Sequence, residues 1–314
     1  MRRESESATR FLPSEILDNI TMRFSEIGEQ LRAYRLESGL RAEEIAARLG
    51  VSRAALYRYE KGEVIKLDTV MRLAELLKIS PLSLLGIGVE YYNRPIGYFE
   101  RLRQIEEGAD QIIQVGRGYT YLITTSQFDA LLADVMEVWS RAAGATAPVA
   151  GTNSEHLLGI LAARKKAYLA RRPTIVTVYS IDSIEALVRH GLCRGFDLPA
   201  SLRARCKQTA IYEVENLIGL MHDDPLGVQL GLLEETPIAG AFKLMRGRER
   251  AMLALSPFNA DGPPDGQYGA AMVTSAEEAL ATHQRVVEHC WRNSLKGQAA
   301  VARLTSLIQL AKAA

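Results

Sequence analysis

The fold of the front of the chain is decided by one stretch of twenty residues, AEEIAARLGVSRAALYRYEK, at positions 42–61. Ile45, Ala46 and Leu49 recur at helical spacing and form the inner stripe of a short first helix. Gly50 permits a left-handed turn, and Ser52 is a residue type that caps the start of a second helix. The stretch therefore predicts two short helices joined by a tight turn.

The second of these helices has one apolar and one polar face. Leu56 and Tyr59 lie three positions apart and face inward, whereas five side chains point outward: Arg53, Ala54, Tyr57, Arg58 and Lys61. Such a helix can enter a DNA major groove, because arginine can form a bidentate pair with guanine. Helix-turn-helix packing also occurs in proteins that never bind nucleic acid, so the flanking sequence has to support the interpretation.

The flanking sequence predicts three further helices. Residues 27–38 carry apolar side chains at helical spacing and stop at Gly39, residues 67–79 form another amphipathic segment, and Pro81 opens a last turn that ends at Gly86. Five helices within about sixty residues indicate an all-α helix-turn-helix domain over residues 25–90. Residues 1–24 precede it as an N-terminal extension.

Residues 27–86 closely resemble the DNA-binding domain of the XRE family of bacterial transcriptional regulators. Members of that family carry segments like those at 49–52, 59–62 and 73–77, which read LGVS, YEKG and LAELL. The resemblance implies that Arg53, Ala54 and Arg58 face base edges, with Tyr57 beside them. An arginine that pairs with guanine contributes roughly 1–3 kcal/mol of discrimination.

The same resemblance implies contacts that fix the position of the domain without reading sequence. Ser52 and Lys61 are expected close to phosphates. The family usually has glutamine where this chain has Ala42, so the resemblance includes Ala42 among the expected DNA-contacting positions, and Arg41 is expected to take over the backbone contact of that glutamine. A buried ion pair of the family would here join Arg35 to Glu60 and have a structural role.

Net charge gives no support for nucleic-acid binding by bulk attraction. The whole chain has a formal charge of +1, and residues 1–90 contain 14 basic and 14 acidic side chains. Affinity must therefore come from where the charges lie. Arg53, Arg58, Lys61 and Lys66 make the outer face locally positive.

Length and composition predict that a second, larger core follows this domain. The chain has 314 residues, of which 47% are hydrophobic, enough for two or three domains. It contains no run of eighteen apolar residues, and its start does not resemble a signal peptide. Together with three widely spaced cysteines, these features predict a cytoplasmic protein without membrane contact.

Residues 91–150 are interpreted as a helical connector. Apolar stripes run through 98–113 and 126–143, and a small-residue linker follows at 143–151. Two such stripes suit a homodimer interface, and a dimer would bind two half-sites about 10 base pairs apart. Packing of both helices within the same chain is the alternative.

Residues 151–314 alternate between helices and strands. The helices are expected over 156–171, 183–190, 198–222, 275–294 and 297–313. The strands are expected over 173–179, 228–233, 238–245, 251–255 and 269–273. This order predicts an α/β domain with a mixed sheet.

The order of elements also resembles the phospholipase D-like fold that some regulators use for ligand sensing, over about residues 154–295. Phospholipase D chemistry requires a His-x-Lys motif, whereas the matching strand here begins Ala241-Phe242-Lys243. Without the histidine there is no nucleophile for phosphoryl transfer. The resemblance therefore implies a non-catalytic sensor domain, and no catalytic residue, metal ligand or cofactor is predicted.

Basic side chains of the rear domain suggest a pocket for an anionic effector. Arg164, Lys165, Lys166, Arg171, Arg172, Arg203 and Arg205 are candidates for binding a carboxylate or phosphate beside two tyrosines. The preferred set is Arg203, Arg205, Lys243, Tyr179 and Tyr212. A solvated helix face is the alternative explanation of these charges.

Taken together, the sequence predicts a one-component transcriptional regulator. Its partners would be a double-stranded DNA operator, a second copy of the chain and a small-molecule effector that alters dimer geometry and operator affinity. An enzyme with a DNA-targeting domain is one rival and requires a complete catalytic constellation after residue 154. The other rival is a DNA-binding scaffold or antitoxin-like protein, whose rear domain would bind a protein partner through an exposed apolar surface.

Overall fold

The computed structural model describes residues 14–143, 154–194, 196–234, 240–248, 250–259 and 269–313. The chain divides into two compact units, a front unit of Met1–Glu90 and a rear unit of Tyr91–Ala314. The predicted linker at 143–151 falls almost wholly outside the described residues.

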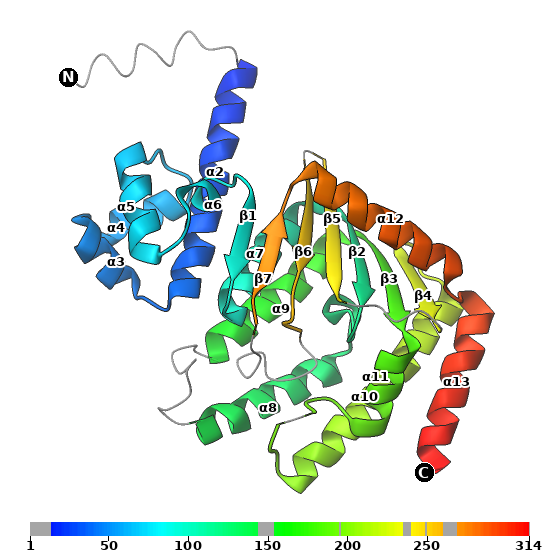
Figure 1. Ribbon diagram of the computed structural model, residues 1–314. Helices are drawn as coiled ribbons and strands as arrows, with labels where there is room; N and C mark the ends of the chain where they lie inside the picture. Colours follow the sequence, from blue (N-terminus) through cyan, green and yellow to red (C-terminus); the bar gives the residue numbers. More distant parts are fainter. Residues whose placement is uncertain are drawn as a thin grey trace, which may run out of the picture. The chain divides into compact units, whose positions relative to one another are not determined.

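The front unit is helical, as the sequence predicted. Its described residues form α2 (Ser14–Ser38), α3 (Ala42–Leu49), α4 (Arg53–Glu60), α5 (Leu67–Leu77) and α6 (Pro81–Leu84), which Figure 1 shows in blue and cyan. Each helix contributes at least one fully buried side chain to the core, among them Leu31, Ile45, Leu56, Leu73 and Leu84. The helix expected over residues 27–38 begins earlier, at Ser14, because the segment that leads into it contains no proline or other helix stop.

Gly28 marks the closest approach of α2 to the end of α4. A Cβ atom at this position would lie 2.6 Å from the carbonyl oxygen of Tyr59 and 2.8 Å from that of Glu60. Both are backbone atoms that no side-chain rotation can move away. The absence of a side chain at Gly28 therefore allows the end of α4 to approach α2 this closely.

Gly28→Ala is expected to destabilise the front unit by about 1–3 kcal/mol, since the added methyl group overpacks a backbone contact. Hydrogen exchange of the α4 amides in the full chain measures this effect. Gly159→Ala is the matched control, because a Cβ there meets nothing within 4 Å. The helix preference for alanine should make that control neutral or stabilising, and equal behaviour of both variants would contradict the close approach.

A seven-stranded mixed sheet organises the rear unit. In spatial order its strands are β1 (Val89–Tyr92), β7 (Ala271–Thr274), β6 (Ala251–Leu255), β5 (Phe242–Gly247), β2 (Ala109–Gly116), β3 (Thr174–Ser180) and β4 (Val228–Leu233). β2, β3 and β4 run parallel, whereas β5, β6 and β7 pair antiparallel. The predicted mixed sheet is confirmed.

Helices cover both faces of this sheet (Figure 1). α12 (Glu277–Asn293) packs against β2, β4, β5 and β6, and α13 (Gly297–Ala313) follows it onto β4. α7 (Pro95–Gly108) packs against β2 and β5 and carries α9 (Ser154–Arg171) on its outer side. α8 (Ser126–Ala143), α10 (Ile181–His190) and α11 (Ala200–Asp223) complete the unit, with a short 3-10 turn, η2, at Tyr121–Ile123.

Successive side chains along a strand point to opposite faces of the sheet, and the two faces differ in polarity. Phe242 and Leu244 of β5 join the apolar cluster beneath α12, together with Val115 and Val287. Lys243 lies between these two residues and so faces the opposite side of the sheet, towards α7. That side carries the polar groups described below.

The structure corrects the predicted helical connector. Residues 98–113 were expected to form one helix, but the helix ends at Gly108 and residues 109–116 form β2, which pairs with β3 and β5 in the middle of the sheet. A strand that is buried on both faces shows no clean alternation, and its isoleucines fit a helical pattern equally well. Residues 91–143 are therefore an integral part of the rear unit.

The apolar stripes proposed as a dimer interface are also buried within the chain. Tyr98, Phe99 and Leu102 of α7 are at most 3% exposed. On α8 the buried stripe comprises Phe128, Leu131, Leu132, Val135 and Met136. The alternative of intramolecular packing describes these helices, because both cover the core of the rear unit.

Candidate functional site

The turn between α3 and α4 has the geometry that its residue types predict. Gly50 adopts a left-handed conformation with φ of 71°, and the Ser52 hydroxyl accepts a hydrogen bond of 3.1 Å from the backbone N–H of Ala55. From α5, Arg72 donates to the carbonyl oxygen of Leu49 at 3.0 Å. The last turn of α3 and the first turn of α4 are thus held at fixed positions.

The expected ion pair between α2 and α4 is present. Arg35 donates from Nε and Nη2 to the two carboxylate oxygens of Glu60, at 2.5 Å and 3.0 Å. Their side chains are 14% and 5% exposed. Glu60 is therefore neutralised internally and adds no unpaired negative charge to α4.

The outer face of α4 presents the side chains that the sequence placed there. Arg53, Ala54, Arg58 and Lys61 are exposed, and Tyr57 is half-buried. Arg41, Ser52 and Lys66 are also exposed around this helix. Arg58 and Arg53 lie within two turns of one another on a helix that is otherwise fixed to the core.

Ala42 is a correction to the predicted contact set. Its side chain is 5% exposed and packs in the core, in the same stripe as Ile45, Ala46 and Leu49. A buried methyl group cannot contact a phosphate. Arg41, just before this end of α3, is exposed, and its backbone N–H donates to the Glu44 carboxylate at 2.9 Å.

Both arginines of the outer face are paired with carboxylates of the same unit. Arg53 Nη1 lies 2.7 Å from Glu43 Oε1, and Arg58 Nε lies 3.4 Å from Glu63 Oε2. A hydrogen bond to Tyr57 and the charge of Glu43 raise the pKa of Arg53 above its ordinary value. DNA would have to replace these pairings, because a guanidinium bound to guanine loses its carboxylate partner.

Glu63→Gln is accordingly expected to strengthen DNA binding several-fold. An exposed ion pair contributes about 0–1 kcal/mol, and the change also removes a negative charge that would approach the phosphates. Fluorescence anisotropy with a duplex at two salt concentrations measures the gain. Glu75→Gln removes the same charge from an exposed position of α5 and should change little; equal effects of the two variants would contradict the pairing argument.

The five residues proposed for the effector pocket do not come together. Arg203, Arg205 and Tyr212 lie on the exposed side of α11, where Arg203 donates to the Leu198 carbonyl at 2.9 Å and Arg205 pairs with Asp134 at 2.7 Å. Tyr179 is buried in β3. Of the five, Lys243 lines the cavity described next and the other four described residues do not, so the predicted grouping is wrong.

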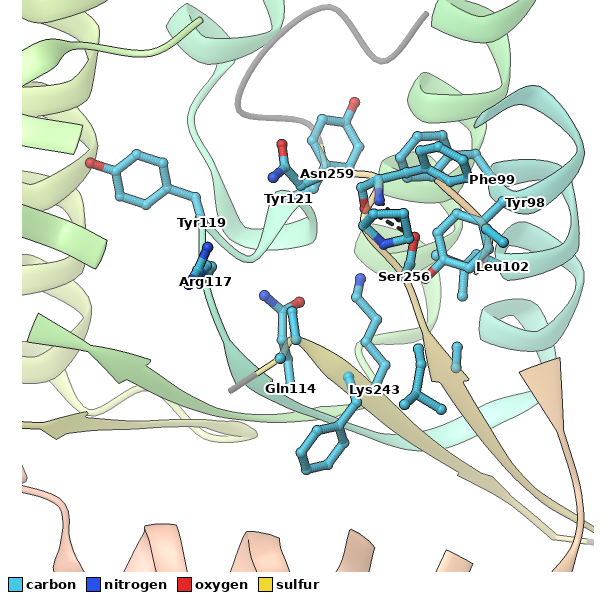
Figure 2. A pocket seen from close by; sticks show the side chains of 18 of the residues that line it. Tyr98, Phe99, Leu102, Gln114, Arg117, Tyr119, Tyr121, Lys243, Ser256 and Asn259 are labelled. Atoms are coloured by element: carbon cyan, nitrogen blue, oxygen red, sulfur yellow. Dashed lines mark hydrogen bonds between the residues drawn. The ribbon is translucent and has the colours of Figure 1, made fainter. Parts of the chain in front are cut away.

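Lys243 belongs to a cavity of about 530 Å³ on the α7 side of the sheet. Gln114, Lys243 and Ala254 are direct neighbours across β2, β5 and β6 and form its floor. Figure 2 shows Lys243 pointing into the cavity, with Gln114 and Arg117 on one side and Tyr98 on the other. The cavity thus combines residues from the sheet with residues from α7.

Three charged side chains meet beneath this cavity. Arg164 of α9 donates from Nε and Nη2 to the Glu106 carboxylate of α7, both at 2.8 Å. Lys243 Nζ lies 3.7 Å from the same carboxylate. Arg164 and Glu106 are almost completely buried, with side chains 1% and 4% exposed.

Burial and charge act in opposite directions on these groups. Burial lowers the pKa of Lys243 to about 8, although the Glu106 charge favours the protonated form. Burial raises the pKa of Glu106, but Arg164 and Lys243 more than offset this effect, and the pKa lies below its ordinary value. Glu106 is therefore an anion that two cations share.

Sequence reasoning missed Glu106, Gln114 and Arg117 as members of this site. Each stands in a segment interpreted as connector, and no local motif distinguishes these residues from ordinary polar positions. Arg164 was among the basic candidates but without its partner. The signal that joins them is spatial, since the elements that carry them are far apart in the chain.

Within the described parts of the chain, no group of three or more His, Cys, Asp or Glu side chains is placed to hold a metal ion. Nor does any described helix have the length and apolar character needed to cross a membrane.

Comparisons with known proteins concern the front unit. Residues 26–84 match the family model described as a helix-turn-helix domain. A Pyrococcus horikoshii protein provisionally named an HTH-type transcriptional regulatory protein is 42% identical over 62 residues, which are 18% of this chain and 20% of that relative. The match thus spans about a fifth of the relative's length, and no solved structure matches the chain significantly. The geometry and the family model together identify residues 26–84 as a helix-turn-helix domain.

Proposed function

We propose that the protein is a sequence-specific DNA-binding transcriptional regulator. The observation that carries the proposal is the outer face of α4, where Arg53, Ala54 and Arg58 are exposed while Leu56 and the Arg35–Glu60 pair fix the helix from behind. Recognition helices of helix-turn-helix domains contact base edges with their N-terminal residues. The name of the Pyrococcus relative agrees with this role.

Membership of the XRE family and a homodimeric state are parts of this proposal. The segments at 49–52, 59–62 and 73–77 support the family resemblance. Dimerisation is supported by the balance of charge over residues 1–90, because a single domain without a bulk positive field gains specificity by joining two half-sites. Since the stripes of α7 and α8 are buried, the dimer surface must lie elsewhere.

The rear unit is proposed to bind a small-molecule effector without catalysing a reaction. The cavity over Lys243 supports this role, because it is concave, of ligand size and lined by a few polar groups among aromatic ones. The succession of α11, β4 and the β5–β6 hairpin agrees with the phospholipase D-like resemblance. Unequal binding to two dimer geometries would then alter operator affinity.

A scaffold or antitoxin-like protein is the alternative. It requires an exposed apolar surface for a protein partner, and Leu169 and Leu226 are exposed at a second cavity of about 430 Å³. The charged cavity over Lys243 favours the effector, since the cores of protein–protein interfaces are depleted of charged residues.

Selection of duplexes from a random pool by the full chain tests the proposed function. A regulator should enrich a two-fold symmetric motif and bind it about 10³-fold or more tightly than a shuffled duplex at physiological salt. Light scattering of the complex should give two chains per duplex. Enrichment of no motif, with weak and salt-sensitive binding to every duplex, would overturn the regulator and favour the scaffold.

A further inference from the structure

The cavity over Lys243 has a composition that selects one class of ligand. We propose that it binds a small organic anion, a carboxylate or phosphate on a flat apolar body that carries one further hydrogen-bonding group. The binding site stands on the geometry of the rear unit alone. Its role as the effector site rests on the proposed function.

Buried charge at the base of the cavity is not balanced. Arg164 and Lys243 share the single carboxylate of Glu106, which leaves one positive charge in excess. Arg164 uses Nε and Nη2 on that carboxylate, while its buried Nη1 has no hydrogen-bond partner. Arg117, which is exposed, adds a third cation to the lining, and no aspartate or glutamate occurs among the described lining residues. A buried cation without a counterion is unfavourable, so a bound anion would stabilise this arrangement.

Gln114 supplies the second polar feature. Its side chain is 6% exposed, and its Oε1 atom is buried without a hydrogen-bond partner. Gln114 lies directly opposite Lys243 in the pairing of β2 and β5, on the same face of the sheet. A ligand anchored at Lys243 therefore brings another polar group within reach of this amide.

The walls are aromatic and favour a flat ligand body. Tyr98 and Phe99 come from α7, Tyr119 and Tyr121 from the segment after β2, and Phe258 from the segment after β6. Figure 2 shows Tyr98, Phe99 and Tyr121 around the cavity into which Lys243 points. Rings of this kind stack on planar groups.

The volume excludes a bare inorganic ion as the fitted ligand. Cavities of 300–1,000 Å³ typically hold molecules of drug or cofactor size, and this one measures about 530 Å³. Sulfate or phosphate would occupy a small part and leave the aromatic walls without a partner. The fitted ligand is therefore one molecule with three features: an anionic group for the excess positive charge, a polar group for Gln114 and a flat apolar body for the aromatic walls.

The test uses calorimetry of the full chain with defined probes. The anionic probes are 4-hydroxybenzoate, indole-3-acetate and phenyl phosphate, the neutral probe is 4-hydroxybenzamide, and acetate and inorganic phosphate lack the ring. At least one anionic aromatic probe should bind about 10-fold or more tightly than the neutral and ring-free compounds. A preference for phenyl phosphate or for the carboxylates assigns the anion.

Two variants separate the site from general charge effects. Lys243→Met removes the excess cation but keeps the Glu106–Arg164 pair, so the variant should fold and lose about 10-fold or more in probe affinity. Lys166→Met removes an exposed lysine of α9 and should leave affinity unchanged. Unaltered binding by a folded Lys243→Met protein, or no binding of any anionic aromatic probe to the wild type, would overturn the inference.

The calorimetric test of the ligand site does not depend on DNA binding. A probe that binds through Lys243 but leaves operator affinity unchanged supports the ligand site and contradicts only its role as the effector site. Failure of operator selection, by contrast, leaves the calorimetric result as it stands.

Discussion

Replacing Glu106 by glutamine should lower the melting temperature of the rear unit by about 10 °C. Glutamine keeps the shape of the side chain and most of its packing, but it leaves Arg164 and Lys243 without their shared anion. Removing one partner of a buried ion pair costs about 3–5 kcal/mol. For a unit of this size each kcal/mol corresponds to roughly 2–4 °C.

Scanning calorimetry of the full chain measures this shift. Glu107→Gln is the matched control, because Glu107 is the next residue on α7 and its side chain is 47% exposed in an ion pair with Arg103. That variant should lose no more than about 1 kcal/mol. A similar shift for both variants would mean that burial of charge does not control the stability of α7.

A triple variant of the same cluster separates the effect of buried charge on stability from the effect of packing. Replacing Glu106, Arg164 and Lys243 together by methionine removes all three charges while filling much of the same volume. Apolar replacement of buried ionic groups is often neutral or stabilising, so this triple variant should be more stable than Glu106→Gln. If it is less stable, lost packing explains the first result and the imbalance of charge does not.

Arg58→Ala and Arg53→Ala should each reduce discrimination between the selected operator and a shuffled duplex by roughly 5- to 150-fold. This range corresponds to the 1–3 kcal/mol of a bidentate contact between arginine and guanine. Binding to the shuffled duplex should weaken much less, with the salt slope smaller by about 1. The variants would thus lose preference for the operator sequence more than general affinity for DNA.

Anisotropy titrations with both duplexes give the two affinities. Arg48→Ala is the control, because it removes an exposed arginine of α3 and leaves α4 unchanged. That variant should preserve discrimination. If both α4 variants keep the operator preference of the wild type, α4 is not the recognition helix, whatever their total affinity.

The front unit could be predicted almost completely from sequence because its signals are local. Gly50, Ser52 and the inner stripe of α3 lie within about ten residues of one another and specify the turn through short-range sterics and hydrogen bonds. The Arg35–Glu60 pair was reached through the family resemblance. Ala42 was misplaced because the resemblance assigned a contact to the position of a glutamine that this chain lacks.

In the rear unit, the helices after residue 154 and the strands β3 and β4 also follow from their patterns. β2 does not, since a strand buried between two neighbours carries the same apolar residues as a buried helix. Because this strand was predicted as part of a helix, residues 91–150 were interpreted as a connector and their helices as a dimer interface.

Sequence by itself thus determined the helix-turn-helix, its exposed arginines and the class of the rear fold. Tertiary structure alone decided which charges meet, because Glu106, Arg164 and Lys243 come from three separate elements and are joined only when α7 and α9 pack against the sheet. Periodicity specifies which face of an element is buried. The partner that a buried charge finds there depends on contacts between residues distant in the chain, and these leave no local pattern.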